Sequence, residues 1–193
     1  MKLILASASP RRRELLEAAA LKFDVITSDI EEVRGAGEEV HRYVERLALE
    51  KATSVARRQP GAWVIAADTV VWLEGEVLEK PSDRAHAIEM LTRIAGRRHV
   101  VYTGTALVNE ELGWARVTVT TTEVEMVEMQ PEEIEWYVDT GEPMDKAGSY
   151  AVQGIGAMFI DAVRGNYTNV VGLPLSTLFG MMRDAGIDPA HYR

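Results

Sequence analysis

The sequence predicts an α/β fold, a single domain built around a mixed β-sheet flanked by helices. Segments rich in strand-forming apolar residues alternate along the chain with segments whose apolar residues recur at helical spacing. Two long β-type runs, 99–109 and 114–127, are separated by only four residues, which is typical of an antiparallel pair. No linker, repeat or low-complexity segment interrupts the 193 residues, so the predicted domain covers 1–193.

The first predicted elements are a short buried strand over 2–6 and a helix that continues to about residue 21. Ser9 followed by Pro10 predicts the start of this helix, because serine caps helix N-termini and proline suits the first helical position. A strand, a tight turn and a helix N-terminus direct free N–H groups and the positive end of the helix dipole to one spot. This arrangement favours an anion. The consecutive arginines at 11–13 either bind that anion or lie on the surface.

A polar loop and a long helix come next. Residues 24–40 pass from a short strand into the loop, which carries Glu31 and Glu32. The helix is predicted over 40–58, and its apolar stripe consists of Val40, Val44, Leu47 and Val55. Lys51 occupies a place in the same series. A lysine there either extends its amine to water or meets an anion.

The stretch 62–81 predicts a β-hairpin that turns at 74–76. Asp68 lies within its first apolar run, which otherwise suits a fully buried strand. A carboxylate in such a place must be paired, hydrogen-bonded or bound to a metal. Asp68 is therefore a candidate functional residue, and Lys80 follows just after the hairpin.

The remaining elements are helices and a glycine-rich segment. Residues 83–95 predict a helix, and 131–141 predict a short helix that opens on proline and closes on glycine. The segment 145–174 has glycines between apolar runs, which indicates backbone brought close to a ligand. A last helix is predicted after Pro174.

Composition excludes several classes of protein. The formal net charge of -9 argues against broad nucleic-acid binding, which depends on a basic surface. No apolar run approaches the ~20 residues needed to cross a membrane, and the first 20 residues lack a signal-peptide layout. The absence of cysteine excludes disulfides and thiolate metal sites. We therefore expect a cytoplasmic enzyme or binding protein.

The polar residues that remain indicate a site for phosphate groups. No Walker-type phosphate loop, zinc-protease motif or nucleophile elbow is present, and the four histidines are scattered. Cations can neutralise phosphate oxygens, while carboxylates can hold magnesium and orient or deprotonate water. The candidate cations and acids are Arg11, Arg12, Lys51, Lys80, Lys146, Glu31, Glu32 and Asp68.

Seven stretches of the sequence form a recognisable series, which reads, in order, LASASPRRREL, IEE, LALEKA, AADTVV, GEVLEKP, EPMDKAGSYAVQGIGAMFI and NVVGLPL. With these stretches in this order, the chain resembles the Maf family of nucleoside triphosphate pyrophosphatases over nearly its whole length. The resemblance implies an elongated mixed sheet with helices around a central cleft, similar to the inosine-triphosphate pyrophosphatase architecture, and a homodimer. It also implies a reaction in which water attacks the α-phosphate of a nucleotide and releases pyrophosphate, with Mg²⁺ or Mn²⁺ as cofactor.

The resemblance carries roles to particular positions. Ser7, Arg11 and Arg12 match the family's phosphate-binding first loop. Glu31 and Asp68 match its acidic pair, which are predicted metal ligands and catalytic residues. Asp68 occupies the general-base position, and whether it acts as a base or only as a metal ligand is open.

Two lysines, Lys51 and Lys80, match the family's active-site lysines and are predicted to stabilise charge on the leaving pyrophosphate. The first of them would then meet a phosphate anion. Glu79 replaces a glycine that many members carry before the second lysine, which bears on the shape of that loop.

Substrate choice is predicted from Thr69 and Gln153, which match the branch that hydrolyses dTTP and UTP. The carboxamide of Gln153 can both donate and accept, which suits the imide edge of thymine or uracil. The predicted substrates are therefore dTTP, UTP and modified pyrimidine triphosphates. The alternatives are a 7-methyl-GTP pyrophosphatase and a non-catalytic nucleotide- or nucleic-acid-binding regulator of septum formation.

Overall fold

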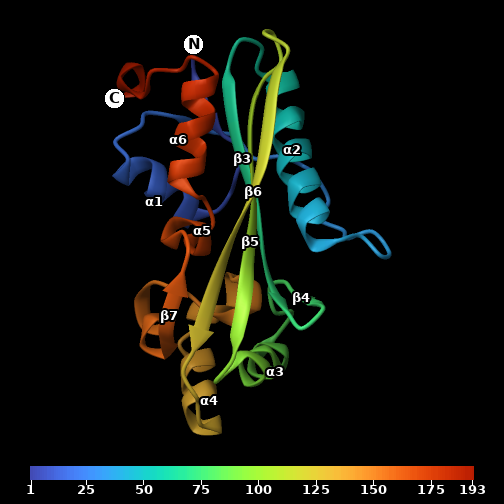
Figure 1. Ribbon diagram of the computed structural model, residues 1–193, viewed down its shortest axis with the longest axis vertical. Coiled ribbons are helices and arrows are strands. Elements are labelled where there is room, and N and C mark those ends of the chain that lie inside the picture. Colours follow the sequence, from blue (N-terminus) through green and yellow to red (C-terminus); the bar gives the residue numbers. More distant parts are fainter. The chain divides into compact units, whose positions relative to one another are not determined.

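The computed structural model describes all 193 residues, and its strands form one mixed seven-stranded sheet (Figure 1). The strands are β1 (Leu3–Leu5), β2 (Asp24–Val25), β3 (Trp63–Leu73), β4 (Glu76–Leu78), β5 (Arg98–Asn109), β6 (Trp114–Met126) and β7 (Ile160–Arg164). Their order is β2-β1-β3-β5-β6-β7, and β4 pairs with β3. β1 runs parallel to β2 and β3, whereas β4 runs antiparallel to β3 and β7 antiparallel to β6. The predicted α/β fold with a mixed sheet is confirmed.

The helices are α1 (Pro10–Ala18), α2 (Val40–Arg58), α3 (Arg84–Ile94), α4 (Pro131–Asp139), α5 (Tyr167–Val171) and α6 (Leu175–Asp184). Short 3-10 turns cover Glu142–Asp145, Ala147–Ser149, Gly154–Phe159 and Pro189–Tyr192. None of the helices combines the length and apolar character that crossing a membrane requires.

The start of α1 corrects one detail of the sequence analysis. The helix begins at Pro10 as predicted, but the Ser9 side chain makes no capping hydrogen bond. The turn is held instead by Ser7, whose Oγ accepts from the backbone N–H of Ser9 at 3.2 Å. The helix ends at Ala18, before Ala20 adopts a left-handed conformation with φ of 56°.

The chain divides into two compact units. The first unit comprises Met1–Asp68, Thr103–Thr120 and Gly172–Arg193, and the second comprises Thr69–Tyr102 and Thr121–Val171. Strands β3, β5 and β6 each contribute residues to both. The single domain over 1–193, the central cleft and the homodimer stay predictions.

The core of the first unit lies between α2 and the sheet. Its buried residues come from β1, α2, β3 and β5 and include Ile4, Ala6, Ala48, Ala52, Val55, Val64, Ala66, Ala106 and Val108. In Figure 1, α2 lies on one side of these strands and α6 on the other. Because strand side chains alternate between faces, Asp68 shares the α2 face of β3 with Val64 and Ala66.

The core of the second unit is built from α3, α4 and the parts of β3, β5 and β6 that belong to this unit. It includes Val71, Leu73, Leu91, Ile94, Val101, Val124, Met126, Ile134, Tyr137, Tyr150 and Phe159. A buried histidine, His99, lies 2.7 Å through Nε2 from the Tyr150 hydroxyl. Burial lowers the pKa of His99 to about 4, so the ring is neutral at pH 7.

Candidate active site

A buried lysine with two carboxylate partners lies at the centre of the candidate site. Lys51 Nζ is 2.6 Å from Asp68 Oδ1 and 2.7 Å from Glu32 Oε1. The Lys51 and Asp68 side chains are 7% and 6% exposed, whereas that of Glu32 is 54% exposed. Lys51 therefore does not extend to water, and the anions it meets in the structure are carboxylates of the same chain.

The helix and the strand explain this pairing. Lys51 lies on the buried stripe of α2 beside Ala48 and Ala52, and this stripe packs on β3. Asp68 points to the same face of β3. Two ionisable groups on facing surfaces are tolerated in the interior because each neutralises the other. The exposed carboxylate of Glu32 leaves one side of the cluster open to water.

The first loop brings a cation to the same unit. Arg12 Nη1 donates to Ser7 Oγ at 3.2 Å, and its Nε donates to the Gly172 carbonyl at 2.8 Å. Ser7 is itself buried, with 8% of its surface exposed. These bonds connect the stretch LASASPRRREL, which contains Ser7 and Arg12, to the stretch NVVGLPL, which contains Gly172.

The three consecutive arginines have different surroundings. Burial lowers the pKa of Arg12 from its usual value, and the nearby carboxylates of Asp68 and Glu32 oppose that shift. Arg13 is exposed and forms an ion pair with Glu17 at 2.7 Å. Arg12 therefore belongs to the site, and Arg13 belongs to the surface. The third, Arg11, is half-buried in the first turn of α1.

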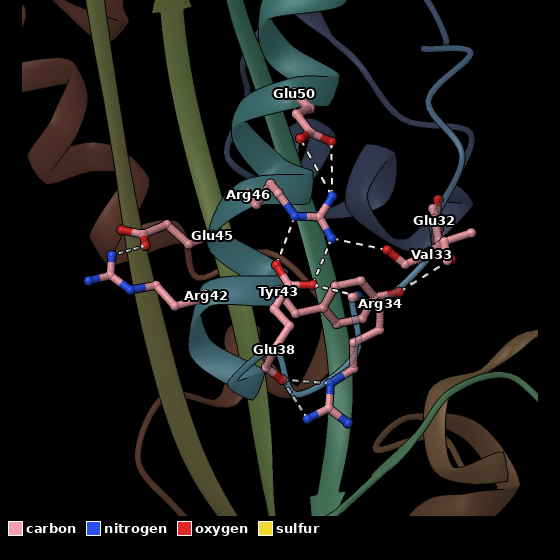
Figure 2. A network of polar contacts seen from close by, with 10 residues as sticks. Glu32, Val33, Arg34, Glu38, Arg42, Tyr43, Glu45, Arg46 and Glu50 are labelled. Atoms are coloured by element: carbon pink, nitrogen blue, oxygen red, sulfur yellow. Dashed lines mark hydrogen bonds and ion pairs between the residues drawn. The ribbon is translucent and has the colours of Figure 1, made fainter.

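The loop that carries the acids is fixed by α2, as Figure 2 shows. We call residues 31–39 the acidic loop. Arg46 donates through Nε and Nη2 to the two carboxylate oxygens of Glu38, each at 2.8 Å, and through Nη2 to the Val33 carbonyl at 3.0 Å. The same carboxylate accepts from the Gly35 N–H at 2.9 Å. The Arg46 bond, together with the backbone bond, lowers the pKa of Glu38 to about 2.

Tyr43 also attaches the acidic loop to α2, next to the site. Tyr43 Oη donates to the Glu32 carbonyl at 3.3 Å, and the Arg46 guanidinium lies 5.7 Å from the centre of the Tyr43 ring. The backbone of Glu32 is thus held where its carboxylate meets Lys51. No sequence pattern indicated this network, because a loop and a helix meet there without a recognisable spacing.

Replacing Arg46 by lysine should loosen the acidic loop. A lysine cannot make the two-pronged bond to Glu38 and also reach Val33, so bonds to a charged group worth about 1.5–3 kcal/mol each are lost. We expect backbone amides of residues 31–39 to exchange at least about tenfold faster, measured by hydrogen exchange. Arg42→Lys is the matched control, because Arg42 pairs only with Glu45 on the same helix. Equal exchange in the two variants would contradict the assigned role of Arg46.

The acids fit a divalent cation. Hard carboxylate oxygens from Asp68 and Glu32 flank one lysine, and Glu31 is the exposed neighbour of Glu32. No three histidine or acidic side chains form a metal-binding group. Magnesium bound to phosphate substrates commonly uses one or two carboxylates, with water and phosphate as the other ligands, so this donor set is suitable. Glu31 stays a predicted ligand, and Glu32 is the acid that the structure places with Asp68 at Lys51.

The second unit carries the remaining predicted residues. Lys80 is exposed just after β4, and Gln153 is exposed at the start of the turn Gly154–Phe159. Their segments are connected through the backbone, since the Gly148 N–H donates to the Glu79 carbonyl at 3.1 Å. Lys146, a further candidate cation, donates to neighbouring oxygens of its own turn.

Thr69 also belongs to the second unit and follows Asp68 directly on β3. Because side chains alternate along a strand, Thr69 points to the face opposite Asp68 and shares the face of Val71. A Cβ added to Gly148 would lie 2.9 Å from a Val71 methyl, so the segment that leads to Gln153 packs along this face. The structure thus places Thr69 and that segment on the same side of β3.

A buried lysine–carboxylate pair beside an arginine loop, on a mixed α/β sheet, is a site that can bind an anion and hold water next to a carboxylate. The family model for Maf-like proteins matches residues 2–185. The chain therefore belongs to the Maf-like protein family, as the sequence analysis predicted.

Relatives match nearly the whole length of the chain. A protein of Syntrophus aciditrophicus named dTTP/UTP pyrophosphatase is 48% identical over 185 residues, which is 96% of this chain and 90% of that protein. Proteins of the same name from Myxococcus xanthus and Bacillus anthracis are 49% and 45% identical and cover 96% and 98% of this chain, and 93% and 98% of their own. Among solved structures, the Ham1 protein of Staphylococcus aureus matches with a TM-score of 0.49 and 18% identity, over 83% of this chain and 80% of that one.

Proposed function

We propose that this protein is a nucleoside triphosphate pyrophosphatase that hydrolyses dTTP, UTP and modified pyrimidine triphosphates to the monophosphate and pyrophosphate, and so cleans the nucleotide pool. The observation that carries the proposal is the buried Lys51–Asp68 pair, joined by Glu32 and lying near Arg12. The names of relatives 45–49% identical over nearly the whole chain support the choice of substrate.

The first loop binds the triphosphate in this proposal. Arg12 is held by Ser7 and Gly172, so its guanidinium is positioned before substrate arrives. Arg11 lies in the same helical turn, and the N-terminus of α1 adds backbone N–H groups and the positive end of its dipole. A polyphosphate would offset the cost of placing two cations at this end of a helix.

Asp68 and Glu31, with Glu32 beside them, would hold Mg²⁺ or Mn²⁺. A bound divalent cation would neutralise phosphate oxygens and withdraw charge from the bond that breaks. The carboxylates themselves repel a polyphosphate, so their presence in a phosphate site is consistent with a role for the cation.

Asp68 accepts the proton from the attacking water. Lys51 holds its Oδ1, and Oδ2 is left to take the proton. The water oxygen forms a bond to the α-phosphorus, and the bond from that phosphorus to the oxygen bridging to the β-phosphate breaks, with its electron pair leaving on pyrophosphate. Lys51 and Lys80, with the arginines, stabilise the charge that develops on the leaving group.

Selectivity for the pyrimidine comes from Gln153 and Thr69. An amide that donates and accepts pairs with the imide edge of uracil or thymine. The base of 7-methyl-GTP, the rival substrate within the family, does not have the imide edge of uracil or thymine. A non-catalytic regulator of septum formation would gain nothing from carboxylates in an anion site, so the enzyme is preferred.

The enzyme is further proposed to act as a cytoplasmic homodimer without nucleic-acid partners. The absence of cysteine suits a reducing compartment, and the net charge of -9 disfavours nucleic acid. The dimer rests on the family resemblance alone.

A panel of nucleoside triphosphates tests the function. Purified protein is incubated with canonical and modified triphosphates and Mg²⁺ or Mn²⁺, and pyrophosphate and orthophosphate are assayed separately. We expect pyrophosphate from dTTP and UTP, with the highest kcat/KM for pyrimidines. A higher kcat/KM for 7-methyl-GTP would overturn the selectivity, and binding without turnover of any nucleotide would favour the regulator.

A further inference from the structure

A carboxylate in the second unit organises the segment that carries Gln153. Glu142 accepts three hydrogen bonds there. Its Oε1 accepts from Tyr137 Oη and from the Gly156 N–H, both at 2.8 Å, and its Oε2 accepts from the Ile155 N–H at 2.9 Å. Burial raises the pKa of Glu142, but the two backbone bonds and the Tyr137 bond outweigh it and hold that pKa below 4.5. The side chain is therefore a satisfied, charged acceptor.

Tyr137 attaches the other end of the same segment. Its hydroxyl accepts from the Ala151 N–H at 3.1 Å while it donates to Glu142. The side chain is fully buried in the second core, and burial raises its pKa well above the usual 10. We call Tyr137 and Glu142 the clamp. It holds residue 151 on one side of Gln153 and residues 155 and 156 on the other.

The backbone between these attachments lies against the clamp. Gly154 has φ of +70°, and a Cβ added there would overlap Glu142 Oε2. The glycines of this segment were expected to approach a ligand, but here they approach Glu142 and Tyr137. In contrast, the Gln153 side chain is exposed, so the clamp fixes the backbone of Gln153 and leaves its carboxamide open to a partner.

We propose that Glu142, acting with Tyr137, is a positioning residue that sets base selectivity by fixing residues 151–156 and hence the carboxamide of Gln153. The proposal rests on the proposed function. At the edge that faces the carboxamide, the groups that donate in uracil accept in cytosine, and the groups that accept in uracil donate in cytosine. A carboxamide therefore distinguishes the two bases only if it is held in place. A loosened segment lets the amide turn to suit either base, so discrimination falls more than turnover.

Glu142→Gln is the sharpest variant, because it preserves the shape of the side chain. One carboxylate oxygen becomes an NH₂ group, which cannot accept. If the NH₂ replaces Oε2, the Ile155 N–H loses its acceptor; if it replaces Oε1, both the Gly156 N–H and the Tyr137 hydroxyl lose theirs. Tyr137→Phe is the second variant and removes the acceptor of the Ala151 N–H.

The experiment measures kcat/KM for UTP and for CTP in the wild type, in both clamp variants and in Glu89→Gln. Glu89 is an exposed acid on α3 and provides the matched control. We expect the UTP-to-CTP ratio of kcat/KM to fall at least tenfold in both clamp variants and to be unchanged in the control. Amides of residues 151–156 should exchange faster in the same variants. An equal loss for both substrates, with the ratio preserved, would show a merely structural role and overturn the proposal.

The activity of the wild type distinguishes a failure of this inference from a failure of the proposed function. If it releases no pyrophosphate from any nucleotide, the proposed function and selectivity by Gln153 both fail. If the wild type prefers UTP and the clamp variants keep that preference, only the inference fails. Melting temperatures identify a variant that does not fold, and the other variant then decides the outcome.

Discussion

Replacing Asp68 by asparagine should lower kcat for pyrophosphate release from UTP by about 10²–10⁴-fold while leaving a folded protein. An amide cannot take a proton from water and binds a divalent cation poorly. Its oxygen can still accept from Lys51, at 2.6 Å in the native protein, so the contact that holds β3 to α2 is weakened but not removed. Pyrophosphate release and thermal unfolding are measured on the same preparation.

Asp161→Asn is the control for this variant, because Asp161 is an exposed aspartate on β7. It should retain wild-type turnover. If Asp68→Asn kept turnover within tenfold of the wild type, Asp68 would be neither the base nor an essential ligand, and the assignment would be wrong.

Replacing Lys51 by methionine should destabilise the protein by about 3–5 kcal/mol and abolish turnover. The change leaves the Asp68 carboxylate, 6% exposed, without its cation, and an uncompensated buried charge is costly. The free energy of unfolding is measured by urea denaturation at pH 7.

Lys2→Met provides the comparison, since Lys2 pairs with Asp24 at 3.4 Å and its side chain is 75% exposed. That surface pair should contribute at most about 1 kcal/mol to the free energy of unfolding. If Lys51→Met and Lys2→Met lowered the free energy of unfolding by similar small amounts, the buried pair of Lys51 and Asp68 would not be important for stability.

The regular elements followed from local patterns. The predicted bounds of α2 agree with Val40–Arg58, because its apolar stripe is long and uninterrupted except by Lys51. The hairpin of β3 and β4 turns at the glycine that its sequence indicated. β7 and α5 were not predicted, since five residues each give too little periodicity and their formation depends on neighbours far along the chain.

The candidate site was predictable where one residue type stood out against its surroundings. Asp68 in an apolar strand and Lys51 in an apolar stripe both require a partner, and the structure pairs them. The contact of Glu32 with Lys51 was not predictable, because the side chains of adjacent residues in an irregular loop point in directions that no sequence pattern indicates. In the structure, Arg46 holds the acidic loop at Val33 and Glu38, and Tyr43 holds the carbonyl of Glu32.

The clamp had no local signal. Glu142 reaches backbone groups 13 and 14 residues further along the chain, across two irregular turns. Sequence patterns report neighbours on one helix or one strand, and neither applies to this segment. Only the folded second unit shows that a charged side chain, and not a ligand, occupies the space beside Gly154.

The most direct test of the account is the position of bond cleavage. UTP is hydrolysed in water enriched in ¹⁸O with Mg²⁺, and both products are analysed by mass spectrometry. Attack of water on the α-phosphorus, beside Asp68, predicts one ¹⁸O in UMP and none in pyrophosphate. Label in pyrophosphate, or release of labelled orthophosphate in its place, would show attack on another phosphorus and contradict the account.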